Sequence, residues 1–193
     1  MSELVDDGLR RCDWSNGSQL YRDYHDTEWG KPLHGADAMF ERLCLEAFQS
    51  GLAWITILRK RPAFRAAFAG FRIPEVAAFD DTDRARLLGD AGIVRNRAKI
   101  DAAIANARVA RGLPVPLDEL VCSFAPAPRP RPATLADVPA TTPESVALAK
   151  ELKRRGFAFV GPTTAYALMQ ATGMVDDHLE VCWVQAASNG TDS

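Results

Sequence analysis

The chain has 193 residues, 47% of them hydrophobic and 25% charged, which is typical of a soluble globular protein with a substantial core. A net charge of -2 excludes a surface coated in phosphate-binding charge, although a local basic face would still suffice for nucleic acid. The N-terminus has no signal stretch and no run of about 18 apolar residues occurs, so we expect a cytoplasmic protein that spans no membrane. The 4 cysteines are too scattered for a disulfide scaffold.

Helical periodicity runs through most of the chain and no strand alternation is visible, so we predict an all-α fold. The predicted helices span 37–49, 53–59, 62–68, 82–91, 95–111, 117–124 and 142–155. Pro62 is expected to open a helix of its own, and Gly112 to end another. Cys44 and Cys122 have apolar neighbours and are predicted to be core thiols.

A proline-rich segment, 125–143, interrupts this pattern and predicts an extended connector or surface loop. We expect one compact helical unit over residues 1–185, which this connector could divide into two lobes. Residues 186–193 are small and polar and are predicted to be a disordered tail.

Two pairs of metal-ligand residues lie at opposite ends of the chain: Cys12 with His25, and His178 with Cys182. The second pair is separated by one helical turn, which on a helix would put both side chains on one face. Two sulfurs and two imidazoles are the donors that tetrahedral structural zinc favours. Spacing alone does not join the two pairs, and buried structural cysteines are the alternative interpretation.

Residues 150–174 predict a helix, a tight turn and a second helix. Gly156 and Gly161 bracket apolar turn residues, and Thr163 and Thr164 are expected to cap the second helix. Amides at the start of that helix could bind one phosphate of a DNA backbone without reading its sequence. An ordinary packed helical hairpin is the alternative.

Aromatic residues are dense between positions 14 and 54, where they include Trp14, Tyr21, Tyr24, Trp29 and Trp54. Aromatic faces stack on nucleobases with about 1–3 kcal/mol per base and also attract cations. Core packing is the alternative for each of them. Glu46 falls at the edge of the buried face of helix 37–49, where a carboxylate is unfavourable without a partner. A solvated or ion-paired glutamate is the alternative there.

Five runs in chain order closely resemble the type I 3-methyladenine DNA glycosylases: 24–30 (YHDTEWG), 45–55 (LEAFQSGLAWI), 91–95 (AGIVR), 155–161 (RGFAFVG) and 176–182 (DDHLEVC). The resemblance covers nearly the whole chain. It implies an all-helical member of the helix-hairpin-helix DNA glycosylases in which a structural zinc joins the termini. The implied partner is double-stranded DNA containing 3-methyladenine, with the free base as product. We expect a monomer in a bacterial cytoplasm, at the nucleoid.

The resemblance also assigns roles by position. It implies that Glu46 contacts the damaged base and that Leu52 wedges into the DNA stack. It implies an aromatic base pocket made of Trp14, Tyr21, Tyr24 and Trp54. It implies zinc ligands at Cys12, His25, His178 and Cys182. Trp29 lies in the same block without an assigned role. The candidate phosphate contacts from the hairpin pattern are Gly156, Gly161, Thr163 and Thr164.

The chain departs from the family at three places. Ala47 and Phe48 stand where members carry Gly-Gln, and Asn96 stands where a histidine is seen. The proline-rich stretch is also unusual. None of these changes removes a predicted zinc ligand or the acidic residue.

Methylation at N3 makes adenine cationic and weakens its bond to the sugar, so the base leaves as a neutral group. A glycosylase must extrude the base into a pocket, and Leu52 would fill the gap. No lysine occurs between 156 and 174, which predicts a monofunctional glycosylase without lyase activity.

Three alternatives remain at the level of the sequence. The first is a non-catalytic, zinc-stabilised module that binds damaged DNA. The second is a bifunctional glycosylase-lyase. The third is a metalloenzyme that uses zinc directly, which four protein ligands would disfavour because they close the metal's coordination.

Overall fold

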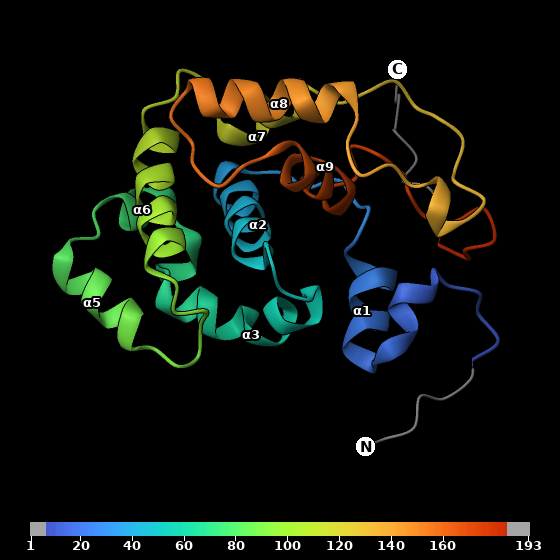
Figure 1. Ribbon diagram of the computed structural model, residues 1–193, viewed down its shortest axis with the longest axis horizontal. Helices are drawn as coiled ribbons and strands as arrows, with labels where there is room; N and C mark the ends of the chain where they lie inside the picture. The colour runs from blue at the N-terminus through green and yellow to red at the C-terminus, as the bar shows by residue number, and fades with distance from the viewer. Residues whose placement is uncertain (1–6, 185–193) are drawn as a thin grey trace.

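The computed structural model describes residues 7–184, and all regular secondary structure in that range is helical (Figure 1). The α-helices are α1 (Gln19–Thr27), α2 (Ala36–Gln49), α3 (Trp54–Ala67), α4 (Ile73–Ala77), α5 (Asp81–Gly89), α6 (Arg97–Arg111), α7 (Leu117–Cys122), α8 (Pro143–Arg154) and α9 (Pro162–Ala171). Short 3-10 helices are η1 (Asp13–Gly17), η2 (Ala69–Phe71) and η3 (Leu135–Asp137). The all-α prediction is confirmed for this range, and the predicted tail at 186–193 lies outside it.

Helix α2 runs through the centre of the molecule (Figure 1). Its residues from Met39 to Phe48 are buried except Glu41, so it is enclosed on nearly all sides. It contacts α3, α6, α7 and α9. Around it, the main core includes a run of packed phenylalanines: Phe48, Phe64, Phe68 and Phe71. Helix α2 is therefore a firmly held platform for any side chain that it projects into a cavity.

The structure corrects two predictions about the helices and the core and adds two helices that were not predicted. One helix, α3, replaces the two expected at 53–59 and 62–68, because Pro62 lies inside it. Proline removes one helical hydrogen bond, but Ile57 and Phe64 on either side are fully buried and hold both halves in one helix. The short helices α1 and α4 were not predicted. Cys44 is a core thiol as expected, whereas Cys122 is exposed at the end of α7.

Helices α8 and α9 form the predicted hairpin, with α8 packed across α9 (Figure 1). Thr142 begins α8 by accepting a hydrogen bond from the Ser145 amide. The turn needs Gly156, whose φ is +101°. The prediction that Thr163 and Thr164 cap α9 is wrong, because both lie inside its first turn. The helix begins at Pro162, after an N-cap without a side-chain hydrogen bond at Gly161.

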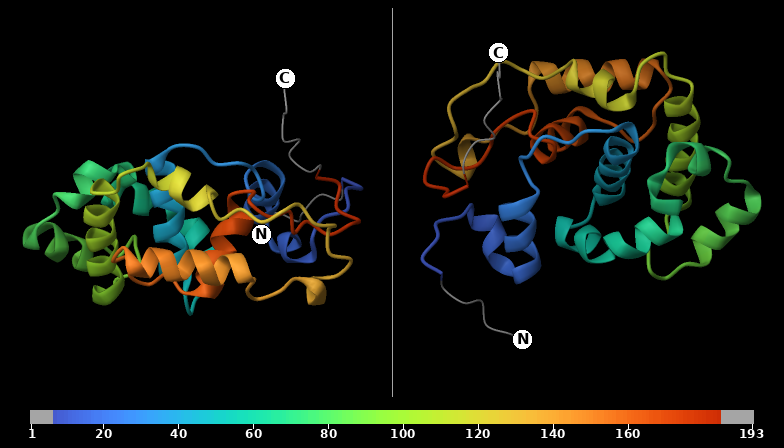
Figure 2. Two further views of the ribbon diagram at one scale, coloured as in Figure 1. Left: turned by 90° about the horizontal axis from the view of Figure 1, so that it is seen from above. Right: turned by 180° about the vertical axis from the view of Figure 1, so that it is seen from behind.

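The N-terminal and C-terminal segments of the described chain lie on the same side of the molecule (Figure 2). The Trp183 amide donates to the Arg10 carbonyl at 2.9 Å. A small apolar cluster, separate from the main core, forms between the ends from Cys12, Leu179, Cys182 and Val184. The proline-rich segment is extended apart from η3, as predicted, and it reaches these ends through a hydrogen bond from the Glu180 amide to the Pro132 carbonyl. No helix within residues 7–184 is long and apolar enough to cross a membrane.

Candidate functional site

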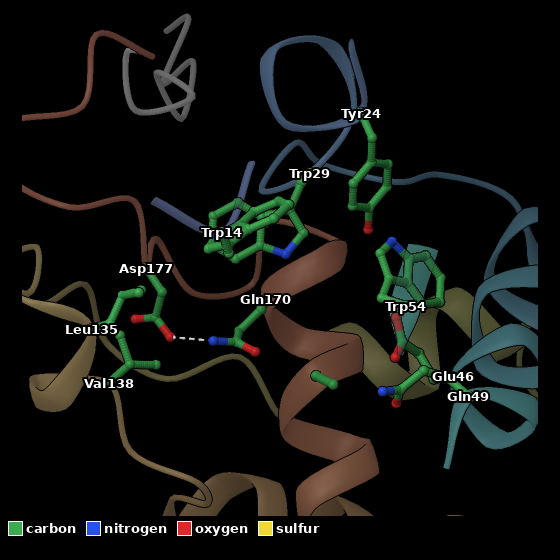
Figure 3. A pocket seen from close by; sticks show the side chains of 11 residues that line it. Trp14, Tyr24, Trp29, Glu46, Gln49, Trp54, Leu135, Val138, Gln170 and Asp177 are labelled. Atoms are coloured by element: carbon green, nitrogen blue, oxygen red, sulfur yellow. Dashed lines mark hydrogen bonds between the residues drawn. The ribbon is translucent and has the colours of Figure 1, made fainter. Parts of the chain in front are cut away.

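A pocket of about 270 Å³ opens between α2, α9 and the N-terminal segment (Figure 3). Its lining residues are Trp14, Tyr24, Trp29, Glu46, Gln49, Trp54, Leu135, Val138, Ala167, Gln170 and Asp177. Segments from both ends of the chain and from its middle contribute, so the pocket exists only in the folded protein. Aromatic rings and two buried acids, Glu46 and Asp177, dominate its chemistry.

The aromatic wall of the pocket is a chain of ring contacts. Trp14 packs edge-on against Trp29, with 5.1 Å between ring centroids, and Tyr24 leans on Trp54 at 5.6 Å. Three of the four predicted pocket aromatics, and Trp29 as well, therefore line the cavity. Tyr21 lies behind the wall, where it meets Trp14 edge-on at 5.6 Å and its hydroxyl accepts a hydrogen bond from the Ile55 amide at 2.9 Å.

Glu46 projects from α2 into this pocket and is only 6% exposed. Burial raises the pKa of its carboxyl to about 7, against the opposing effect of the Arg42 charge. Arg42 is itself engaged by the Tyr24 hydroxyl at 2.7 Å and by Glu28. No hydrogen bond or ion pair from residues 7–184 reaches the Glu46 carboxylate, so both of its oxygens are free to accept from a bound molecule.

Glutamine at position 46 should stabilise the protein at high pH only. A carboxyl whose pKa rises from 4.5 to about 7 on folding is held protonated in the native state, so stability falls as pH rises through this window. We expect Glu46→Gln to raise the free energy of unfolding by about 3 kcal/mol near pH 8 and hardly at all near pH 4.5. Urea unfolding of both proteins at the two pH values measures this. A difference that does not change with pH would contradict the raised pKa.

The two pairs of candidate metal ligands come together in space. Their donor atoms all lie within 4.8 Å of one another, and all four residues are buried. His178 Nδ1 is 3.2 Å from His25 Nε2 and 3.5 Å from Cys182 Sγ, and it is 3.9 Å from Cys12 Sγ. Tetrahedral zinc with ordinary Zn–N and Zn–S lengths requires donor separations of roughly 3.3–3.8 Å. The separations from His178 lie close to this range, so the four residues could hold a metal ion. His178 and Cys182 lie in a turn after α9, not on the helix considered from their spacing.

The two histidines are oriented by groups outside the cluster. His25 Nδ1 is 2.8 Å from the Asp26 carboxylate, which Arg11 also binds. His178 Nε2 lies 3.3 Å from the Trp29 carbonyl, which directs Nδ1 into the cluster. A Cβ added at Gly30 would come within 2.9 Å of His178 Nε2, which explains glycine after Trp29. Burial lowers the pKa of His178 to about 4, so its ring is neutral at physiological pH, as a metal ligand must be.

The residues predicted to contact DNA lie in two places on the surface. Leu52 is 37% exposed at the tip of the turn between α2 and α3. Lys99 fixes this turn by donating to the Phe48 carbonyl at 2.9 Å and the Ser50 carbonyl at 2.6 Å. At the hairpin, Gly161 and Thr163 are exposed beside the N-terminus of α9, and Thr164 is half-buried. A Cβ at Gly161 would meet nothing within 4 Å, so the approach to the first amides of α9 is open.

Sequence reasoning missed several lining residues. Gln49 lies one helical turn after Glu46, so helical spacing could have suggested it. Ala167 and Gln170 lie one turn apart on α9, where no predicted pocket residue marks that face. Leu135 and Val138 come from the proline-rich segment, whose path over the pocket no local pattern predicts.

Known proteins resemble this chain along nearly its full length. A sequence profile of the methyladenine glycosylase family matches residues 14–185. DNA-3-methyladenine glycosylase 1 of Escherichia coli is 45% identical over 179 residues, which cover 90% of this chain and 96% of that protein. DNA-3-methyladenine glycosylase of Haemophilus influenzae is 41% identical over 178 residues, covering 89% and 96%.

A solved structure extends the agreement to the fold. The structure of 3-methyladenine DNA glycosylase I from Staphylococcus aureus, described as the basis of 3-methyladenine recognition, superposes with a TM-score of 0.88 at 30% sequence identity. The match covers 94% of this chain and 99% of that one. The resemblance read from the sequence is confirmed, and the chain belongs to the methyladenine glycosylase family.

Proposed function

We propose that this protein is a monofunctional DNA glycosylase that hydrolyses the N-glycosidic bond of 3-methyladenine in alkylated double-stranded DNA. The observation that carries the proposal is the buried Glu46, which lies without a partner from residues 7–184 in a pocket walled by Trp14, Trp54 and other aromatic rings. The names of its relatives support the same substrate. We further expect it to act as a monomer at the bacterial nucleoid.

The pocket chemistry suits a cationic, flat base. Extruded 3-methyladenine would stack on rings such as Trp54, which adds cation–π attraction to ordinary stacking. The Glu46 carboxylate would accept a hydrogen bond from the adenine edge and stabilise its positive charge. This interaction is strong because the group is buried and desolvated. The bond to the sugar is already weakened by methylation, so water attack completes hydrolysis, and the base leaves neutral.

Leu52 and the hairpin are proposed to hold the distorted duplex. Leu52 lies on a turn that the hydrogen bonds of Lys99 hold in place. A side chain that fills the space of a flipped base must be held firmly in this way. Gly156 and Gly161 shape the hairpin so that α9 offers its first amides, with Thr163 and Thr164 beside them, to a DNA phosphate. The absence of lysine between 156 and 174 supports hydrolysis without strand cleavage.

A carboxylate at the start of α9 should weaken DNA binding without affecting the base pocket. We expect Gly161→Asp to reduce affinity for duplex DNA roughly tenfold, because the added charge repels the phosphate that the helix N-terminus would bind. Fluorescence anisotropy with labelled duplex measures this. The Gly161→Ser control caps the same helix without charge and should bind nearly as well as wild type. Equal affinities for all three proteins would exclude a phosphate contact here.

We propose that Cys12, His25, His178 and Cys182 bind one structural zinc ion. Their donor set and separations support this, as do the outer contacts of both histidines. The ion would tie the ends of the chain together beside Trp14 and Trp29, which line the base pocket. Four protein ligands leave no coordination position for water, so no step of hydrolysis is assigned to the metal.

Identification of the released product tests the proposal. Purified protein is incubated with methylated duplex DNA, small molecules are separated by chromatography, and the strands are run on a denaturing gel. We expect free 3-methyladenine above the protein-free control and intact strands before alkaline treatment. Strand breaks that are already present before alkaline treatment would indicate a lyase. Retention of damaged DNA without released base would favour the non-catalytic binding module.

A further inference from the structure

Gln170 and Asp177 form a polar pair on the side of the pocket opposite Glu46 (Figure 3). Gln170 belongs to α9, and its amide nitrogen donates to Asp177 Oδ2 at 2.8 Å. Asp177 is only 2% exposed. The same carboxylate accepts from the Tyr166 hydroxyl at 2.5 Å and from Arg129 Nη2 at 2.6 Å. Three donors therefore converge on Asp177, and only Gln170 among them lines the pocket together with it.

The surroundings of Asp177 determine which way the Gln170 amide faces. Nitrogen and oxygen of a glutamine amide are close in shape, so their positions follow from the hydrogen-bond partners. An aspartate paired with a guanidinium has only acceptors, so Gln170 must turn its NH2 group toward it. The carbonyl oxygen then points away from Asp177 (Figure 3). Within residues 7–184 this oxygen has no hydrogen-bond donor, so it remains an unused acceptor at the cavity.

We propose that Gln170 determines specificity by accepting a hydrogen bond from the exocyclic amine of the extruded base, and that Asp177 is the positioning residue that fixes its amide. This inference rests on the proposed function. Adenine carries an amine at position 6 whose two hydrogens would serve Glu46 and Gln170, whereas guanine carries a carbonyl oxygen there. A guanine would bring its oxygen against the Gln170 oxygen and leave both acceptors unpaired, which disfavours binding. The pair thus selects alkylated adenine over alkylated guanine.

The ratio of two release rates tests the role of Gln170. Duplex DNA containing both 3-methyladenine and 3-methylguanine is incubated with enzyme, and kcat/KM for each base is obtained by chromatography. We expect Gln170→Met, which keeps the volume but removes the acceptor, to lower the adenine-to-guanine ratio roughly five- to tenfold. A variant that is partly unfolded loses both activities equally and leaves the ratio unchanged.

Gln19→Met is the matched control, because Gln19 also donates its amide to an aspartate, Asp23, at 2.7 Å but lies exposed on α1. It should leave the ratio as in wild type. Asp177→Asn frees the Gln170 amide to turn, so it should also lower the adenine-to-guanine ratio. The metal content of this variant is measured as well, because His178 is the next residue.

The possible outcomes separate the inference from the proposed function. An unchanged ratio in Gln170→Met overturns the specificity role while 3-methyladenine release continues. An unchanged ratio in zinc-loaded Asp177→Asn overturns the positioning role. If wild type releases no 3-methyladenine, the proposed function fails, and this inference fails with it.

Discussion

Replacing Glu46 by glutamine is expected to slow the release of 3-methyladenine roughly tenfold to a hundredfold near pH 8, where the wild-type carboxyl is ionised. The amide has nearly the same shape and keeps one oxygen acceptor, so the pocket stays filled. What is lost is a full negative charge beside a cationic base in a desolvated site, where charge-assisted hydrogen bonds are strongest. Single-turnover release from methylated duplex measures the chemical step without interference from product dissociation.

Glu41→Gln is the matched control for this substitution. Glu41 lies on the same helix but pairs with Arg65 at 2.8 Å, outside the pocket. We expect wild-type release from it. If Glu46→Gln stays within about twofold of wild type, the carboxylate has no electrostatic role in excision.

Serine in place of Cys182 is expected to abolish zinc binding and to destabilise the protein by several kcal/mol, a large share of the roughly 5–15 kcal/mol that holds a typical domain folded. The reason is the small size of the apolar cluster between the chain ends, which consists of four buried residues with Trp14 and Trp29 packed against it. Elemental analysis gives the metal content, and urea unfolding gives the stability. A chelator that strips the wild-type protein should reproduce the change.

Cys122→Ser controls for the loss of a thiol as such, because Cys122 is exposed and stands apart from the cluster. It should retain about one zinc per chain and wild-type stability. A Cys182→Ser protein as stable as this control would show that packing alone joins the ends. Wild type purified without a stoichiometric metal ion would contradict the zinc assignment directly.

The helices that could be predicted from the sequence are those with strong periodicity or clear end signals. Helix α2 has its apolar residues at helical spacing, and α6 and α8 are followed by Gly112 and Gly156. Helix α1 was missed because it is short and mostly polar, with only Tyr24 and His25 buried. Pro62 alone predicts the start of a new helix, but buried side chains on both sides of it keep α3 continuous.

The positions of the site residues were predictable where they belong to sequence motifs and unpredictable where they depend on contacts between distant segments. Glu46 and the four candidate metal ligands came from motifs and a family resemblance, and the structure brings the ligands together. Gln170 carries no such motif. Its orientation depends on Asp177, which in turn depends on Arg129 from the proline-rich segment, and no local pattern connects these three positions.

The pH dependence of kcat/KM for 3-methyladenine release tests most directly whether an ionised Glu46 selects the cationic base. Because kcat/KM reports groups on the free enzyme, we predict that wild-type activity falls about tenfold per pH unit below a pKa of about 7 and is constant above it. Glu46→Gln should show low activity without this acidic limb. A limb that persists in the variant, or wild-type activity that stays constant down to about pH 5, would contradict the account.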